Sequence, residues 1–229
     1  MKKFELTNEF VTNMFGTKLF RIRALVEFGD VEAGELGGYV EKESNLGHDD
    51  NAWVYDNAWV YGNARVYGDA LVYDNARVYD NAWVYGDAQV SGDARVYGNA
   101  WVYGDAQVSG DARVSGNARV YDNAWVYGNA QVSGDARVCG DARVCGNGDY
   151  AYAHGFGSVN RTTTFFRLKD GGVGVRCGCF YGTLAQFRDK IRETHGETKK
   201  AQEYLMLADL MELRFEEDEN EVGNRKYVE

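Results

Sequence analysis

Alanine and valine recur at fixed six-residue intervals through the middle of this chain. From Asp50 to Cys145, sixteen units follow one another without an insertion, and each reads Gly or Asp, Asn or Asp, Ala, a variable residue, Val, then Tyr, Ser or Cys. Apolar residues two and then four apart trace no helical stripe, whereas an extended backbone places Ala and Val on one face. The pattern predicts a short strand in each unit, with the variable residue and the Tyr, Ser or Cys facing outward.

The residues between these strands favour corners. Gly-Asn, Gly-Asp and Asp-Asn pairs tolerate positive φ, and Asx side chains can bond nearby backbone groups. Three strands and three corners would close a triangular coil of eighteen residues. Because one unit cannot bury its own apolar face, the units must stack on each other, and the sequence predicts an all-β solenoid.

The repeat resembles that of a known family. Strings such as Val60-Tyr61-Gly62-Asn63-Ala64-Arg65 are similar to the hexapeptide repeat of left-handed parallel β-helices, although the position after the aliphatic residue is mostly Tyr here. The resemblance implies left-handed coils. Gly38-Tyr39-Val40 and Ser44-Asn45-Leu46 add two degenerate units before a two-residue slip, so about six coils are expected.

Stacking every eighteenth residue sorts the outward side chains into three faces. The first carries Tyr67, Tyr85, Tyr103 and Tyr121 beside Arg65, Trp83, Trp101 and Arg119. The second carries Arg77, Arg95 and Arg113 beside Tyr61, Tyr79 and Tyr97. The third carries Trp53, Tyr55, Leu71 and Tyr73, then Gln89, Ser91, Gln107 and Ser109, and finally Trp125 and Tyr127. All five tryptophans therefore occupy positions expected to face outward.

These aromatic rows have two interpretations. They can stack along the solenoid and stabilise it, as cross-strand aromatic pairs do. Alternatively they form an interface, because Tyr, Trp and Arg are enriched at binding hot spots. The interface candidates are Trp83, Tyr85, Trp101, Tyr103, Tyr67, Tyr121, Arg77, Arg95 and Arg113. Partners would be further copies, with a trimer implied by the hexapeptide resemblance, or another protein.

The sequence divides the chain into four predicted segments. Residues 1–36 form an N-terminal cap with a strand near 19–26, residues 37–146 form the β-helix, residues 147–215 form a small C-terminal α+β domain, and residues 216–229 form an acidic tail. In the α+β domain we expect strands over 162–168 and 173–180 joined by a turn at 169–172. Helices are expected over 184–195, with Thr183 as N-cap, and over about 199–215.

The flanks carry a second resemblance. Two segments, Gly178-Cys179-Phe180-Tyr181-Gly182-Thr183 and Glu193-Thr194-His195-Gly196, are similar to a C-terminal module on proteins of tailed phages and prophages. The opening, Arg21-Ile22-Arg23-Ala24-Leu25 through Gly37-Gly38-Tyr39-Val40, resembles phage and bacterial hexapeptide proteins often labelled acyltransferases. The resemblance implies an accessory protein of a mobile element, in the cytoplasm of a bacterial host.

Acyl transfer needs a histidine base and a wall around the site. The three histidines, His48, His154 and His195, all lie outside the regular repeat, and no loop interrupts it. The sequence therefore leans against an enzyme, and we expect no cofactor. Another hypothesis is capture of a small anionic, nucleotide-like ligand as a counter-defence function, through His154, Arg161, Arg167, Arg176, Phe165 and Tyr181. Strand alternation also allows these to be ordinary surface and core residues.

Composition narrows the partners. The net charge is −10, and the repeat holds twelve Asp against seven Arg, which argues against nucleic acid because backbone binding depends on cations. No apolar run is long enough to cross a membrane, and Glu5 and Glu9 interrupt the start of any signal peptide. Four cysteines without a Cys-x-x-Cys motif suggest reduced thiols and no metal. Cys177 and Cys179 are expected on one side of a strand, as two small buried residues or as a disulfide or metal pair.

Overall fold

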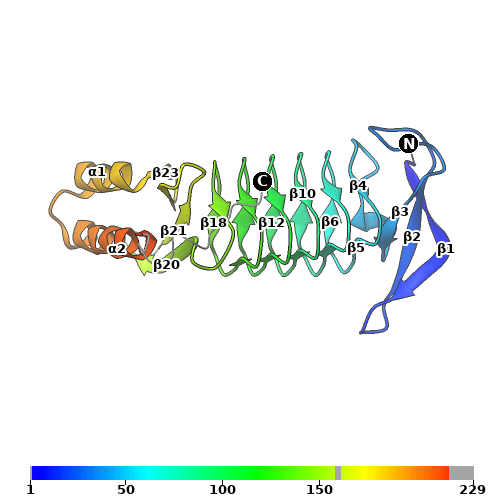
Figure 1. Cartoon of the computed structure of the whole chain (residues 1–229), viewed down its shortest axis with the longest axis horizontal. Coiled ribbons are helices and arrows are strands. Elements are labelled where there is room, and N and C mark those ends of the chain that lie inside the picture. Colours follow the sequence, from blue (N-terminus) through cyan, green and yellow to red (C-terminus); the bar gives the residue numbers. More distant parts are fainter. Residues whose placement is uncertain (1, 158–160, 217–229) are drawn as a thin grey trace.

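The repeat folds as very short strands joined by corners. The computed structural model describes residues 2–157 and 161–216. The solenoid strands are β4 (Trp53–Val54), β5 (Trp59–Val60), β6 (Arg65–Val66), β7 (Leu71–Val72), β8 (Arg77–Val78), β9 (Trp83–Val84), β10 (Gln89–Val90), β11 (Arg95–Val96), β12 (Trp101–Val102), β13 (Gln107–Val108), β14 (Arg113–Val114), β15 (Arg119–Val120), β16 (Trp125–Val126), β17 (Gln131–Val132), β18 (Arg137–Val138) and β19 (Arg143–Val144). They form the middle of an elongated molecule (Figure 1).

Three parallel sheets run along the solenoid, in the predicted register. Face 1 consists of β6, β9, β12, β15 and β18, face 2 of β5, β8, β11, β14 and β17, and face 3 of β4, β7, β10, β13, β16 and β19. Each residue pairs with the one eighteen positions away, as Gln89 does with Gln107. The predicted β-solenoid of about six turns is confirmed.

Alanine and valine fill the core. The Ala and Val of every unit from Ala52 to Val144 have no exposed surface. The corners use positive φ at the first residue of each pair, for example 71° at Gly98 and 61° at Asp80. A Cβ added to Gly98 would lie 3.0 Å from the backbone nitrogen of Gly116 in the next coil. Close stacking of corners therefore favours glycine at this position.

One corner is held by a ladder of side-chain amides. Between faces 2 and 1, the amide of each Asn donates to the next residue of the ladder at 3.0–3.2 Å, through Asn63, Asn81, Asn99, Asn117 and Asp135. These bonds repeat at the coil spacing. They tie successive coils together outside the backbone hydrogen bonds.

The ladder gives a stability prediction. Replacing Asn99 with Ala removes two hydrogen bonds, one to each neighbour. We expect a loss of about 1 kcal/mol of unfolding free energy, measured from urea denaturation. Asp105→Ala is the matched control, because Asp105 is an exposed residue at the next corner along the chain. A loss for Asn99→Ala no larger than for Asp105→Ala would contradict a stabilising ladder.

The N-terminal cap is a β-sheet extension of face 2. Strands β1 (Phe4–Thr12) and β2 (Lys18–Ala24) form an antiparallel hairpin, and β2 pairs with β3 (Leu36–Val40). The sequence predicted one strand near 19–26 and missed β1, because its alternation is broken by the bulge in its pairing with β2. β3 then joins β5 in parallel, which places the cap on the first coil.

The two-residue slip is confirmed. Val40 pairs with Val60 and Leu46 with Val66, so each pair is separated by one coil plus two residues. Between them lies the 3₁₀ helix η1 (Glu43–Asn45). The buried Asn45 amide donates to the carbonyls of Gly62 and Ala64. It thereby satisfies backbone groups that the irregular coil leaves open.

The cap corrects the expectation that every tryptophan faces solvent. Trp53 is fully buried, and its ring packs edge-on against Phe4 and Phe28. Lys3 is also buried there, and its Nζ donates to the carbonyls of Asp50 and Ala52. Burial lowers the pKa of Lys3 to about 8. Trp53 points outward from the first coil, but the cap covers it.

The C-terminal domain closes the other end. Strands β20 (Tyr150–Phe156), β21 (Arg161–Arg167), β22 (Val173–Cys177) and β23 (Phe180–Thr183) form an antiparallel sheet, followed by α1 (Leu184–His195) and α2 (Lys199–Phe215). The sheet lies between the last coil and the helices (Figure 1). Thr183 accepts from the Gln186 amide and caps α1 as predicted.

One strand prediction for this domain was wrong. The return strand ends at Cys177, and residues 178–179 form a turn before β23, because Gly178 has a φ of 60° that bends the chain back. Cys179 therefore lies exposed in the turn while Cys177 is partly buried, so the two are not a buried pair on one strand. The predicted acidic tail lies, apart from Glu216, outside the described residues. Of the helices in the described part, none has the length and apolar character needed to cross a membrane.

Candidate functional site

Face 1 carries two adjoining rows of stacked side chains. Tyr67, Tyr85, Tyr103 and Tyr121 stack with ring centroids 4.9–5.0 Å apart and ring planes within 4°. Beside them, Trp83 and Trp101 stack at 5.4 Å. The coil repeat places identical rings at equal height on successive strands, and this produces the stacking.

Cations lie at both ends of the tryptophan row and at one end of the tyrosine row. The guanidinium of Arg65 lies 5.6 Å from the Trp83 ring centroid, and that of Arg119 lies 4.6 Å from the Trp101 ring. At the end of the tyrosine row, Arg176 of β22 lies 5.9 Å from the ring of Tyr121. Cation–π contacts of this kind cover the ring faces that stacking leaves open at the ends of a row.

Most of these ring faces are consequently covered within the chain itself. Tyr67, Tyr85, Tyr103, Trp83 and Trp101 are half-buried. Tyr121 is buried, beside Cys139. Burial raises the pKa of Tyr85 and Tyr103. Face 1 thus presents a fixed, half-buried aromatic array with few open ring faces.

Face 2 combines a second tyrosine row with arginines. Tyr61, Tyr79 and Tyr97 stack at 5.0 Å. Arg77 lies 4.5 Å from the ring of Trp59, whereas Arg95 and Arg113 are exposed. Within residues 2–157 and 161–216, none of these three arginines has a carboxylate within ion-pair distance.

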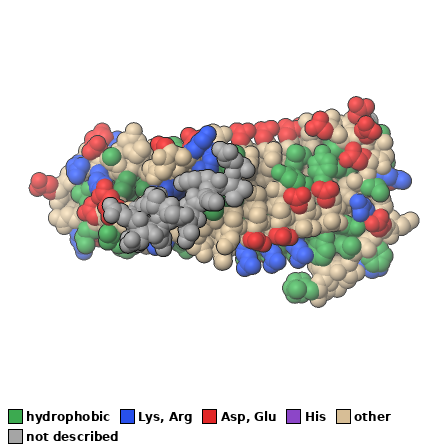
Figure 2. All heavy atoms as spheres, viewed as in Figure 1, with side chains coloured by type: hydrophobic (Ala, Val, Ile, Leu, Met, Phe, Trp, Pro, Cys, Tyr) green, Lys and Arg blue, Asp and Glu red, His purple; other side chains and the backbone are tan. Residues whose placement is uncertain are grey.

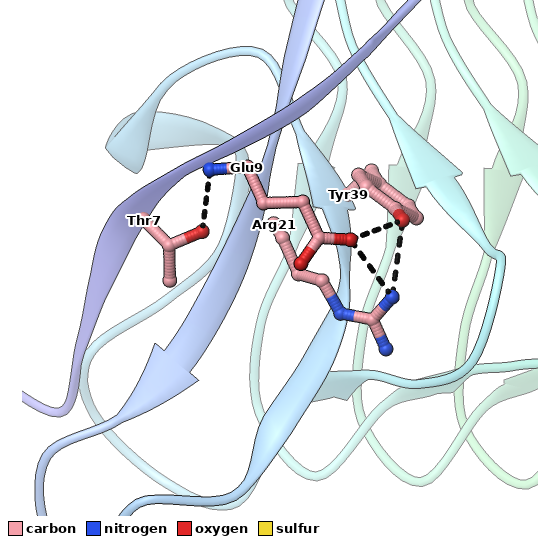
Figure 3. A network of polar contacts seen from close by, with 4 residues as sticks. All are labelled: Thr7, Glu9, Arg21 and Tyr39. Carbon is pink, nitrogen blue, oxygen red and sulfur yellow. Dashed lines mark hydrogen bonds and ion pairs between the residues drawn. The ribbon is translucent and has the colours of Figure 1, made fainter.

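The cap supplies the first residue of the outward row that continues with Trp59 and Arg77. Tyr39 pairs with Trp59 in the neighbouring strand and belongs to the same outward row. Its hydroxyl donates to Glu9 at 3.1 Å and accepts from Arg21 at 3.0 Å, and Arg21 also contacts Glu9 at 3.4 Å (Figure 3). This network links β1, β2 and β3, so it fixes the cap on the solenoid.

The structure does not bring the predicted ligand residues around one cavity. Phe165 is buried against Phe187 of α1, and Arg167 lies over Phe215 of α2 and donates to its carbonyl. Arg176 contacts face 1, as described. Successive side chains of β21 and β22 point to opposite faces of the sheet. Phe165 and Arg167 therefore face the helices, whereas Arg176 faces the last coil.

The remaining ligand candidates serve local contacts. Tyr181 stacks on Phe166 at 6.5 Å, and its hydroxyl is hydrogen-bonded to the backbone of Asp141. His154 is exposed and bonds Thr162 at 2.9 Å. Arg161 is exposed at the start of β21, with its guanidinium beside Gly178.

The other two histidines are also in structural contacts. His48 stacks on Phe4 and accepts a hydrogen bond from the Lys3 amide, and burial lowers its pKa. His195 stacks on Tyr204 at the end of α1. The three histidines therefore lie in three different parts of the molecule.

A shallow groove of about 390 Å³ lies where the last coil meets the C-terminal domain. It is lined by Gln131, Ser133, Asn147, Tyr150, Ala151, Tyr152 and Arg214. The Arg214 guanidinium donates to the carbonyl of Asn147 at 3.3 Å, and Tyr152 is 41% exposed. Sequence reasoning missed this groove because its walls come from the last repeats, β20 and α2, and no local motif joins them.

Comparison with known families agrees with the fold. Residues 58–72, 70–86, 88–104, 106–119, 112–128, 118–134 and 130–146 match the YdcK beta solenoid repeat. The matched stretches lie within the solenoid, and they make this part of the chain similar to that repeat. No curated protein matches the chain.

Proposed function

We propose that this protein is a non-catalytic β-solenoid scaffold that binds a protein partner through face 1. The observation that carries the proposal is the fixed array of Tyr67, Tyr85, Tyr103, Trp83 and Trp101 with flanking arginines. Side chains already held in place lose little conformational entropy on binding. Tyr, Trp and Arg are also the residues enriched at hot spots.

The resemblance of both flanks to phage and prophage proteins supports placing this scaffold among mobile-element accessory proteins. In that setting the solenoid would present face 1 while the capped ends prevent end-to-end pairing of strands. The stacking also stabilises the solenoid. A binding role must therefore be tested with variants that remain folded.

The test compares tryptophans on two faces. Trp83→Ser/Trp101→Ser should weaken binding and leave the protein folded at the assay temperature, because both side chains are half-buried outside the core. Trp125→Ser on face 3 is the control, since Trp125 is 41% exposed. Immobilised wild type and both variants would be incubated with host extract, and bound proteins quantified by mass spectrometry. Each enriched protein would then be purified and its affinity for the three forms measured.

We expect a partner whose affinity falls at least about tenfold for the double variant and stays unchanged for Trp125→Ser. A partner that binds all three forms equally would assign the interaction to another surface. Absence of any partner with measurable affinity would leave the stacked rows with a stabilising role alone.

A second candidate function is capture of a small anionic ligand, and the junction groove favours it. The volume of about 390 Å³ lies within the range of small-molecule sites. Arg214 supplies a cation and Tyr152 a ring for stacking. A melting shift with cyclic or linear nucleotides that disappears in Arg214→Ala would support this function. A shift that persists in Arg214→Ala would place the ligand elsewhere.

A further inference from the structure

Opposite charges form rows on opposite sides of the solenoid. Figure 2 shows acidic side chains along the upper edge of the solenoid, and basic side chains with acidic ones beside them along part of its lower edge. The corner between faces 1 and 3 carries Asp69, Asp87 and Asp105 on three successive coils, all exposed. Arg77, Arg95 and Arg113 occupy three successive strands of face 2. In a triangular coil this corner lies opposite face 2.

Neither row is held in an ion pair within the described residues. Residues 2–157 and 161–216 contain no ion pair to any of these six side chains. Asp69 accepts hydrogen bonds from Asn51, and Arg77 lies over the ring of Trp59. The contact is therefore assigned to the other four charges of the two rows, Asp87, Asp105, Arg95 and Arg113. Like charges repeated at a coil spacing of roughly 4.8 Å repel each other along each row.

The two rows fit each other better than they fit an arbitrary partner. Both rows repeat at the coil spacing, so a parallel copy of this chain would place one carboxylate opposite one guanidinium on three successive coils. Asp93 and Asp111, at the corner between faces 3 and 2, lie near the arginine row in sequence and reduce its net charge. We therefore expect the equal spacing of the aspartate and arginine rows, rather than the net charge of either row, to determine which partner binds.

We infer that a second copy of this chain lies parallel to the first, with Asp87 and Asp105 of one copy against Arg95 and Arg113 of the other. The contact uses two different surfaces, so one copy keeps a free arginine row and the other keeps a free aspartate row. Such contacts close into a ring or continue sideways. The inference does not depend on a partner at face 1.

Charge reversal tests this contact. Arg95→Glu/Arg113→Glu and Asp87→Arg/Asp105→Arg each place like charges across it. Sedimentation velocity at tens of micromolar protein in 50 mM salt should show self-association of the wild type and at least about a tenfold weaker association of each variant. Raising the salt to 500 mM should weaken the wild-type association as well.

Two combinations make the test specific. An equimolar mixture of the two reversed proteins restores opposite charges at both contacts, and so does one chain with all four substitutions. Both should associate as the wild type does. Lys199→Glu/Lys200→Glu, which reverses two exposed charges on α2, should have no effect. Circular dichroism would confirm that all variants are folded.

A monomeric wild type at 50 mM salt would overturn the inference. Reversed variants that still associate, or combinations that fail to restore association, would overturn it equally.

Discussion

Between about pH 10 and pH 12 this protein should unfold, and its tyrosines should ionise in the same transition. Burial raises the pKa of Tyr79 to about 12, with the neighbouring Tyr61 and Tyr97 adding to the shift. Burial raises the pKa of other stacked or packed tyrosines as well, namely Tyr55, Tyr61, Tyr67, Tyr85, Tyr103, Tyr121 and Tyr181.

The sign follows from proton binding. Above pH 10 the unfolded chain has lost its tyrosine protons, while the folded chain retains them, so the unfolded state is favoured as the pH rises. The stabilisation is complete below pH 10 and is lost as the pH approaches 12. Lys3 acts in the opposite direction, because its folded pKa of about 8 is below the unfolded value of 10.5. Eight tyrosines should outweigh this one lysine.

The measurement combines two signals. Tyrosinate absorbance and circular dichroism would be recorded together during an alkaline titration. Tyr79→Phe should retain its fold to slightly higher pH and should lose one late-titrating hydroxyl. Ionisation of all tyrosines near pH 10 in a protein that stays folded would show that the stacked rows do not exclude water from their hydroxyls.

A single carboxylate in the core should disrupt the solenoid. Val108 is fully buried in the middle of the solenoid, where its layer offers only Ala and Val side chains and no cation. Val108→Asp would bury an unpaired charge, and we expect a loss of about 3–5 kcal/mol of unfolding free energy, measured by urea denaturation. Because each coil contacts only its neighbours, limited proteolysis should cut the chain near the substitution first.

Gln107→Asp is the matched control. Gln107 is the preceding residue in the same strand but points outward, so the same side chain there stays hydrated. Its effect should be within about 1 kcal/mol. Similar losses in the two variants would mean that the alternation of inward and outward positions does not govern stability here.

The repeat was predictable because its information is local and redundant. Each six-residue unit predicts the same short strand and the same corner. The strand register and the core residues of the solenoid therefore follow from any single unit. The cap was harder to predict, because the burial of Trp53 depends on Phe4 and Phe28 from distant positions. A strand pattern shows that Trp53 leaves the coil but not what covers it.

The candidate site shows the same division. Stacking of Tyr85 on Tyr103 follows from period eighteen alone. The proposed ligand set failed to converge because neighbouring strands alternate, which sends Phe165 toward α1 and Arg176 toward Tyr121. The junction groove depends on the packing of α2 against the last coil, and no short segment encodes that packing.

The absence of insertions between Asp50 and Cys145 also makes this molecule adjustable in length. Gain or loss of eighteen residues adds or removes one whole coil, so it would change the distance between the two caps by roughly 4.8 Å and leave their relative orientation unchanged. Gain or loss of six residues would instead rotate one cap relative to the other by a third of a turn. Recombination between similar repeats can therefore change the distance between the caps while preserving their relative orientation. The solenoid therefore sets the distance between its two caps in steps of one coil.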